Sequence, residues 1–346
     1  MAKPGEVPGF AFAVLPALGL RSLMSPQSNE NTAAVAMIAV DMDGTLLGED
    51  GQVSARNLAA LQAAHEAGVE VVVATGRRHC YAMRVLRPLG LPHGIALVSS
   101  NGTVTRTLGS ATQDTRLLSR THMRNETGRW LLEHMKEFRD ALVITFDRVG
   151  PDGEDSRGAL VVEHLEELHG SIGRWMAANE PYIAHVSPVE SVFAEAAEPA
   201  IQMMLCGTIE RMRRAEARML EHPAVLGAGG SAAESCVPEI AMHRTEYPER
   251  DLSILDILPA GCSKGAALLA LAAKRGVAPE QVLTIGDNWN DVPMFEVSGT
   301  AVVMGNAPAD LKELARERGW RIGRANHEDG VAEAIEAALR AVEVVG

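Results

Sequence analysis

Two acidic residues directly after an apolar run constrain this chain more than any other feature of its sequence. The run 33–40 is short, continuous and apolar, as expected of a strand covered on both faces of a parallel sheet. Asp41 and Asp43 follow it, within the segment Asp41-Met42-Asp43-Gly44-Thr45. Functional residues of open α/β sheets lie at the carboxyl ends of the strands. Two acids there repel each other unless a cation lies between them, so the segment indicates either a divalent-metal site or an ordinary acidic turn.

The length and composition limit the number of domains and the class of protein. A chain of 346 residues exceeds one typical domain, so we expect two domains. One of them can be inserted in the other. Hydrophobic residues make up 47% and charged residues 22%, which is typical of a soluble protein with a sizeable core. The net charge of −13, from 32 basic and 45 acidic residues, argues against a nucleic-acid or membrane partner.

The cysteines and the N-terminal segment indicate the compartment. No C-x-x-C pair is present, so we predict reduced thiols in a cytoplasmic protein; the four cysteines are Cys80, Cys206, Cys236 and Cys262. No apolar stretch approaches the ~20 residues of a membrane helix. The segment 10–20 faintly resembles a signal peptide, but Pro16 interrupts it, so we expect residues 1–33 to be a disordered extension.

Buried strands alternate with helices at both ends of the chain. The predicted strands are 33–40, 69–77, 95–100, 282–287 and 300–305. The predicted helices are 55–68, capped by Ser54, 81–86, 264–276, capped by Ser263, and 330–342. This alternation predicts a doubly wound, Rossmann-like parallel sheet with right-handed crossovers, built from residues 34–102 and 259–346.

Residues 103–258 have a different pattern, with short strands and separate amphipathic helices. We predict an inserted α+β domain there, which can lie over the carboxyl edge of the sheet and act as a lid that selects substrates. Its strands are expected at 103–106, 141–146, 159–164, 201–207 and 253–258, and its helices near 126–138, 166–178 and 209–220. The segment 150–158 is expected to be an exposed loop, Trp130 and Trp175 to belong to the core of this domain, and Arg211, Arg213, Arg214 and Arg218 to form a solvated helix face.

Four sets of reactive residues fall at strand ends or at a helix start. They are Asp41 with Asp43, Thr75 with Gly76, Lys264, and the run 286–291. Each alone has an ordinary structural explanation: an acidic turn, a helix cap, a surface lysine or an acidic loop. Their occurrence at separate strand ends of one sheet instead favours phosphoryl transfer. A carboxylate can attack phosphorus only if the repulsion between anions is neutralised, and Mg²⁺ does this.

The residue types suggest a division of roles. Asp41 and Asp287 fit as side-chain ligands of Mg²⁺, and Asp43 fits as a backbone-carbonyl ligand whose carboxyl group remains available. A carboxylate nucleophile forms an acyl-phosphate, while a second acid protonates the leaving oxygen and then deprotonates water. The phosphoryl oxygens would be held by Thr75, the Gly76 amide and Lys264.

Four ordered motifs resemble those of the haloacid dehalogenase superfamily, specifically its Cof-type phosphatases with a large α/β cap. They are DMDGTLL at 41–47, ATGR at 74–77, GCSKGAAL at 261–268 and GDNWNDVPM at 286–294. Further similar segments are SSNG at 99–102, AVVMGNA at 301–307 and NHEDGVAEAIE at 326–336. The resemblance implies that Asp41 is the nucleophile, that Asp43 is the general acid/base and that Mg²⁺ binds Asp41, Asp43 and Asp287. It also implies that Asn290 contacts the phosphate, with Asp291 and Thr45 in support.

The resulting prediction is a Mg²⁺-dependent phosphatase that forms an aspartyl-phosphate intermediate. Its substrate would be a small phosphorylated metabolite, either a sugar phosphate or a phosphorylated cofactor or precursor. A phosphomutase or phosphotransferase of the same fold shares the first half-reaction and stays open, as does a non-catalytic metabolite-binding protein, which would predict degraded motifs. We expect a cytoplasmic monomer or weak homo-oligomer.

Two other patterns carry less weight. The glycine-rich segment 227–232 matches a dinucleotide-binding pattern, but the proline that follows in 231–239 argues against the long helix such a site needs. His164 and His169 are five residues apart and would not share a helix face, which argues against a zinc pair.

Overall fold

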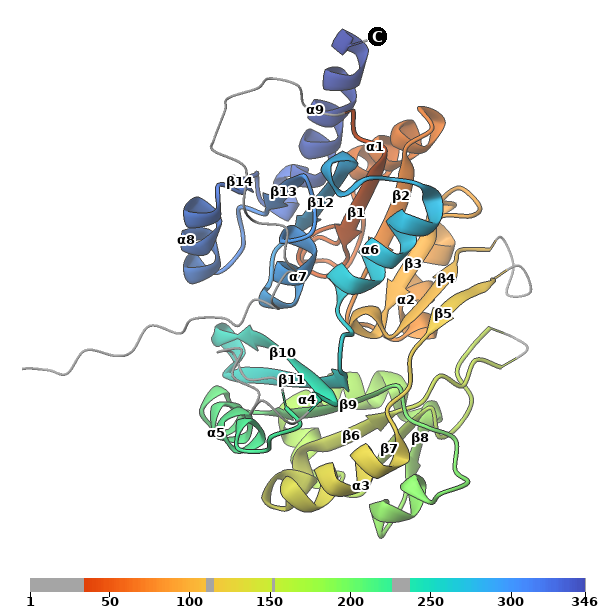
Figure 1. Cartoon of the computed structure of the whole chain (residues 1–346), viewed down its shortest axis with the longest axis vertical. Helices are drawn as coiled ribbons and strands as arrows, with labels where there is room; N and C mark the ends of the chain where they lie inside the picture. Colours follow the sequence, from red (N-terminus) through yellow and green to blue (C-terminus); the bar gives the residue numbers. More distant parts are fainter. Residues whose placement is uncertain (1–33, 110–114, 151–152, 226–236, 346) are drawn as a thin grey trace, which may run out of the picture.

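The chain forms two sheets, each with its own helices and hydrophobic core, stacked one above the other (Figure 1). The structure is a computed structural model that describes residues 34–109, 115–150, 153–225 and 237–345. The predicted N-terminal extension 1–33, the glycine-rich segment 227–232 and Cys236 lie outside the described residues. In the described part, the other three cysteines are buried and unpaired, as predicted. None of the described helices is long and apolar enough to cross a membrane.

The first sheet has eight strands and carries the motifs. In spatial order these are β14 (Arg321–Ile322), β13 (Thr300–Val303), β12 (Val282–Gly286), β1 (Met37–Asp41), β2 (Glu70–Ala74), β3 (Ala96–Ser99), β4 (Val104–Thr107) and β5 (Leu117–Arg120). The first six are parallel, and β4 and β5 are antiparallel. Val40 pairs with Val73 on one side and Ile285 on the other, so the carboxyl ends of β1, β2 and β12 meet at one edge.

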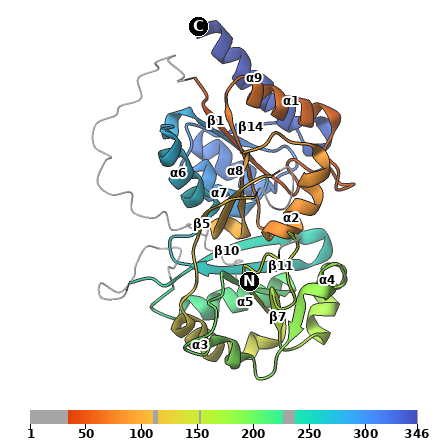
Figure 2. The ribbon, with the colours of Figure 1, turned by 90° about the vertical axis from the view of Figure 1, so that its right-hand side faces the viewer.

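Helices cover both faces of this sheet, which confirms the predicted doubly wound architecture. One face packs against α1 (Ala55–Glu66), α2 (His79–Leu86) and α9 (Gly330–Val345), and the other against α6 (Lys264–Arg275), α7 (Val292–Phe295) and α8 (Ala309–Arg318) (Figure 2). Alternation along β1 explains this: Ile38 and Val40 belong to the first core, Met37 and Ala39 to the second. Ser54 and Ser263 cap α1 and α6 as predicted, each accepting a hydrogen bond from a backbone N–H of the first turn.

The second sheet belongs to the inserted domain, which we call the cap. Its order is β10 (Ile240–Tyr247), β11 (Leu252–Pro259), β9 (Gln202–Gly207), β6 (Leu142–Thr145), β7 (Leu160–Val162) and β8 (Ile183–His185). The helices α3 (Asn125–His134) and α5 (Ile209–Leu220) pack on its outer face. On the inner face, α4 (Glu166–Asn179) covers one part of the sheet and leaves the rest turned toward the first domain.

The boundary of the cap differs from the prediction of residues 103–258. The strand predicted at 103–106 corresponds to β4, which turns back at a 3₁₀ segment (Ser100–Gly102) and pairs antiparallel with β3, so β4 and β5 stay with the first sheet. The sequence pattern of a short strand does not show which sheet it joins, because that pairing depends on contacts distant in the chain. In the other direction, the cap strand β11 ends at Pro259, one residue beyond the prediction.

Several salt bridges join the cap to the first domain, and two of them are buried or nearly so. The β4 residue Arg106 donates two hydrogen bonds, of 2.9 and 2.7 Å, to Asp147 of the cap. Asp155, in the segment predicted to be an exposed loop, forms a buried salt bridge with Arg78, at the N-cap position of α2. The prediction of exposure is therefore wrong for this residue, because the acid meets a cation of the other domain.

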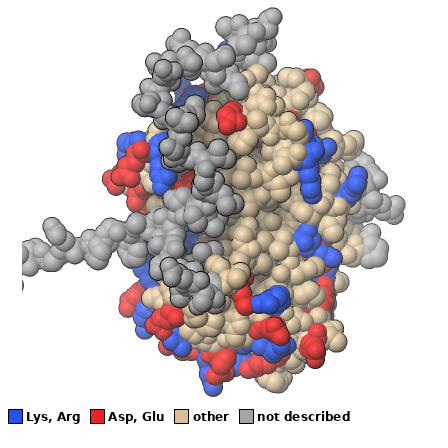
Figure 3. Space-filling view, in the orientation of Figure 1, with Lys and Arg blue, Asp and Glu red and all other residues tan. Residues whose placement is uncertain are grey.

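The outer surface of the cap carries charges of both signs, interspersed along the lower part of the molecule in Figure 3. The predicted arginine face of α5 is partly confirmed: Arg213 and Arg214 are exposed, whereas Arg218 is half-buried. Arg211 is also half-buried and bridges Asp140 and Glu167. Trp130 packs on the outer core as predicted. We therefore assign most of these arginines to ordinary surface ion pairs.

Candidate active site

Asp41 lies at the carboxyl end of β1, buried beneath the cap, and faces two other acids. Gly44 makes this arrangement possible: its φ is +76°, and a Cβ there would lie 2.4 Å from Oδ2 of Asp287. The position therefore requires glycine, for both conformation and space. Thr45, predicted as a supporting residue, donates a 2.8 Å hydrogen bond to Oδ1 of Asp287 and is fully buried.

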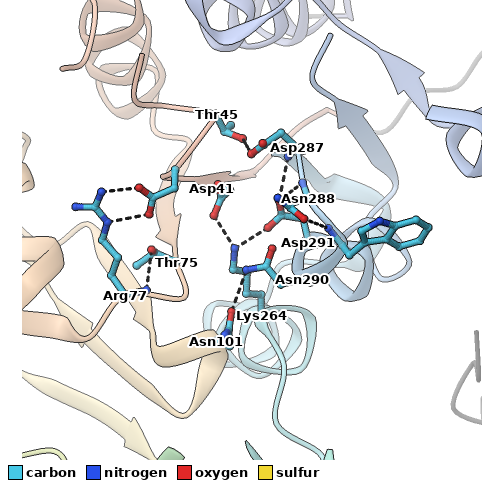
Figure 4. A network of polar contacts seen from close by, with 12 residues as sticks. Asp41, Thr45, Thr75, Arg77, Asn101, Lys264, Asp287, Asn288, Asn290 and Asp291 are labelled. Carbon is cyan, nitrogen blue, oxygen red and sulfur yellow. Dashed lines mark hydrogen bonds and ion pairs between the residues drawn. The ribbon is translucent and has the colours of Figure 1, made fainter. Parts of the chain in front are cut away.

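Lys264 is the cation at the centre of this acidic site (Figure 4). Its Nζ lies 2.6 Å from Oδ1 of Asp41 and 2.6 Å from Oδ1 of Asp291, and its side chain is 0% exposed. It is the first residue of α6, where the helix dipole disfavours a cation. The two carboxylates compensate for that position and for the loss of hydration.

Asp291 has a second role, in shaping the loop that carries Asp287. Its Oδ2 accepts hydrogen bonds of 3.0 Å from the backbone N–H groups of Asp287 and Asn288. A Cβ at Gly286 would lie 2.6 Å from Cγ of Asp291, so the strand end must be glycine for the carboxyl group to fit.

The site holds more negative charge than its one lysine neutralises. Burial raises the pKa of Asp41 well above its usual value, and the charge of Asp291 raises it further. Burial, followed by the charge of Asp291, raises the pKa of Asp287 to about 7. Burial alone would lower the pKa of Lys264, but Asp291 and Asp41 outweigh it and raise that pKa. Lys264 alone therefore does not balance the charge of the three acids.

The donor set fits a divalent cation. Carboxylate oxygens of Asp41, Asp287 and Asp291 all lie within 4.8 Å of one another. Hard oxygen donors in such a cluster are those that Mg²⁺ prefers. Asp41 and Asp287 are two of the three predicted metal ligands. Asp291, predicted only as support, is the third member of the cluster in the described part of the chain.

The carboxylate of Asp43 points elsewhere. It accepts hydrogen bonds of 2.8 and 2.5 Å from Nε and Nη2 of Arg77, while its side chain stays 45% exposed. The Arg77 guanidinium lies 5.0 Å from the ring centroid of Tyr81. Arg77 is part of the ATGR motif but has no role among the predicted site residues. Its position directly after Thr75 and Gly76, at the same strand end, is the sequence feature that could have identified it as a site residue.

The predicted phosphate-binding residues surround the same point. Thr75 is buried at the end of β2, and its Oγ1 accepts a 3.1 Å hydrogen bond from the backbone N–H of Arg77. Gly76 and Asn290 both line the cavity beside Asp41. The structure therefore brings every predicted site residue to one edge of the sheet. Their individual roles stay predictions.

A cavity of about 260 Å³ lies between this edge and the inner face of the cap. From the first domain, the lining includes Asp41, Asp43, Arg77, Arg78 and Tyr81. The cap contributes residues from six elements; they are Thr145, Leu160, Trp175, Gln202, Met204, Thr245, Tyr247, Ile254 and Asp256. None of these cap residues was a predicted site residue, and Trp175 was expected only in the core of the cap. Trp175 does pack on that core, but it also lines the cavity.

Comparisons with known proteins agree with this geometry. A sequence profile described as haloacid dehalogenase-like hydrolase matches residues 38–335. The chain is 28% identical over 318 residues to the 5-amino-6-(5-phospho-D-ribitylamino)uracil phosphatase YwtE of Bacillus subtilis, covering 87% of this chain and 97% of that one. It is 25% identical to an HMP-PP phosphatase of Shigella flexneri, covering 80% and 86% of the two chains.

Solved structures show the same fold. A haloacid dehalogenase-like hydrolase from B. subtilis superposes with a TM-score of 0.66 at 24% identity, covering 87% of this chain and 99% of that one. Another, from Bacteroides thetaiotaomicron, has a TM-score of 0.60 at 23% identity, covering 88% and 99%.

Proposed function

Because this chain belongs to the haloacid dehalogenase-like hydrolases and is a phosphatase of the Cof type, we propose that it hydrolyses small phosphorylated metabolites with Mg²⁺ as cofactor. The observation that carries the proposal is the position of Asp41. Its carboxylate is held 2.6 Å from Lys264, belongs to a three-acid cluster and borders the cavity. A nucleophile, a cation and a place for a substrate therefore meet at one point.

Two acids would divide the chemistry. Asp41 would attack phosphorus and form an aspartyl-phosphate, while Lys264 beside it offsets charge on the phosphoryl oxygens. Asp43 would protonate the leaving oxygen and later deprotonate the attacking water. The two hydrogen bonds from Arg77 orient the Asp43 carboxylate at the cavity wall. Separate partners for the two acids thus support separate roles.

Mg²⁺ would be held by Asp41 and Asp287 with the backbone carbonyl of Asp43, and Asp291 would complete the acidic surroundings. When bound, it neutralises the repulsion between carboxylate and phosphate and acts as a Lewis acid. The raised pKa values of Asp41 and Asp287 support this assignment, since a cation at their carboxylates would restore their ionised forms.

The cavity supports a small substrate with polar groups. Its volume of about 260 Å³ lies just below the range typical of sites for drug-sized ligands. Its cap side mixes aromatic rings with amide, hydroxyl and carboxylate groups. The names of the two curated relatives, a ribitylaminouracil phosphate phosphatase and an HMP-PP phosphatase, agree with a phosphorylated cofactor precursor, and a sugar phosphate fits the same volume. We further propose a cytoplasmic monomer or weak homo-oligomer.

The test is phosphate release from a panel of phosphorylated sugars and cofactor precursors, with and without Mg²⁺. We expect release in Mg²⁺, a loss of about 10³-fold after EDTA treatment, and recovery when Mg²⁺ is returned. Activity indifferent to chelation would remove the metal from the proposal. Release that requires an acceptor sugar would instead identify a phosphotransferase, because a phosphatase passes the phosphoryl group to water.

A further inference from the structure

A chain of hydrogen bonds crosses from the cap to the phosphate side of the site. On the cap, the Gln202 amide on β9 donates to Oδ1 of Asp256 on β11. Across the interface, Nδ2 of Asn101 donates a 2.8 Å bond to Oδ2 of Asp256. The Nδ2 of Asn290 then donates a 3.2 Å bond to Oδ1 of Asn101. Asp256 and Asn101 are both buried, and the mechanism proposed above uses neither.

The backbone holds Asn101 in place for this contact. It has φ = +51° in the turn that follows β3, a conformation that asparagine tolerates better than most residues. Its side chain lies directly over Gly76, where a Cβ would come within 3.2 Å of Oδ1 of Asn101. Asn101 thus lies between Gly76 and Asn290, the two cavity residues expected to contact the phosphate.

The direction of the hydrogen bonds follows from Asp256. Its two oxygens each accept a hydrogen bond from a neighbouring amide, so the NH₂ group of Asn101 faces it. The carbonyl oxygen of Asn101 then faces Asn290, and the Asn290 amide must turn its NH₂ group toward Asn101. The second hydrogen of that NH₂ group is available on the cavity side, where an anionic phosphoryl group needs a donor.

We propose that Asp256 is a positioning residue that, with the cap seated on the first domain, orients the amides of Asn101 and Asn290 for phosphoryl transfer. The inference rests on the proposed function, because it concerns the phosphate side of the same site. Asp256 belongs to the cap, whereas Asn101 and Asn290 belong to the first domain, so the orientation requires both domains in contact. The cap therefore contributes to the chemical step as well as to the choice of substrate.

The test is a double-mutant cycle between Asp256 and Asn101, measured with p-nitrophenyl phosphate and ribose 5-phosphate in Mg²⁺. D256L removes the acceptor, and we expect kcat to fall about 10- to 100-fold on both substrates, because the loss acts on the phosphate side. Asp256→Asn keeps an oxygen toward Asn101 if Gln202 reverses its amide, and should stay within about 3-fold of wild type. In an Asn101→Gly background, which preserves the left-handed conformation, D256L should change kcat less than about 3-fold.

Ser253→Ala is the matched control, since Ser253 lies on the same strand and alternates to the opposite face. A loss on ribose 5-phosphate alone would overturn the proposal and show a direct substrate contact. Additive losses in the cycle would also overturn it, because a purely structural role predicts independence. If D256L does not fold, D256A takes its place in the same comparison. Wild-type enzyme inactive on both substrates would refute the phosphatase function itself, which is a different result.

Discussion

The two walls of the cavity differ in how they are built. The wall formed by the eight-stranded sheet is dominated by charge: Asp41 lines the cavity and is buried in a cluster with two further acids and Lys264. The cap wall is mostly neutral and mixes aromatic, amide and hydroxyl groups from six elements. The difference indicates that one wall requires a fixed set of residues for its chemistry, whereas the other can vary with the substrate.

The charged wall should be intolerant of change, and Asp41→Asn tests this with the largest expected effect. Loss of the nucleophile should lower phosphate release by at least about 10⁴-fold. Unfolding temperature should change little, because Lys264 keeps Asp291 as a partner. Asp50→Asn, an exposed acid in the same region, is the control and should keep wild-type activity. Substantial turnover by the Asp41→Asn variant would contradict the nucleophile assignment.

Lys264→Met tests whether that wall depends on its one buried cation. The substitution leaves Asp41 and Asp291 buried without a positive partner, so the free energy of unfolding should fall by about 3–5 kcal/mol. Urea denaturation in EDTA measures this free energy of unfolding. Lys274→Met, near the exposed end of the same helix, should change it by less than about 0.5 kcal/mol. Equal stabilities of the two variants would contradict a stabilising role of the Lys264 ion pairs.

Asp256 is the buried acid of the cap wall. The pH dependence of folding stability tests whether burial affects it as it affects the acids of the charged wall. Burial raises its pKa to about 7, although hydrogen bonds from Gln202 and Asn101 oppose the shift. Between pH 4 and 7 the folded state therefore holds a proton that the unfolded state has released, so stability falls as pH rises and levels off above 7. Asp256→Asn removes the contribution of this carboxyl group to the pH dependence of stability. Its stability relative to wild type should rise between pH 4 and 8 by at most about 4 kcal/mol, measured by urea denaturation in EDTA. A pH-independent difference would contradict the raised pKa.

Trp175→Leu tests the tolerance of the cap wall and has the smallest expected effect. The ring borders the cavity, so its loss should raise KM about 10-fold for the best substrate of the panel while kcat stays within about 3-fold. Trp130→Leu makes the same change on the outer face of the cap sheet, where the residue packs away from the cavity. A larger fall in kcat than in affinity would show that the two walls are not separable.

The charged wall was largely predictable because its residues occur in short motifs directly after buried strands. The parallel register then brings the strand ends together, so sequence proximity to a strand end was enough to place Asp41, Thr75 and Asp287. The cap wall was not predictable in this way, since its residues converge from separate strands and from one helix. Asp256 did leave a signal: it is a single acid within the apolar strand SILDIL. An acid there requires buried hydrogen-bond partners, but only the fold could identify them.

The β4–β5 hairpin also matters for exchanging caps between relatives. A chimera cut at residue 103 would remove two strands of the catalytic sheet and expose the edge of β3, whereas cuts after Arg120 and Pro259 leave that sheet whole. The donor cap would also have to supply an acid for Arg106, and another for Arg78, or each guanidinium would lose its salt bridge. Grafts that respect these junctions would change which molecules are dephosphorylated while keeping the catalytic residues of the recipient.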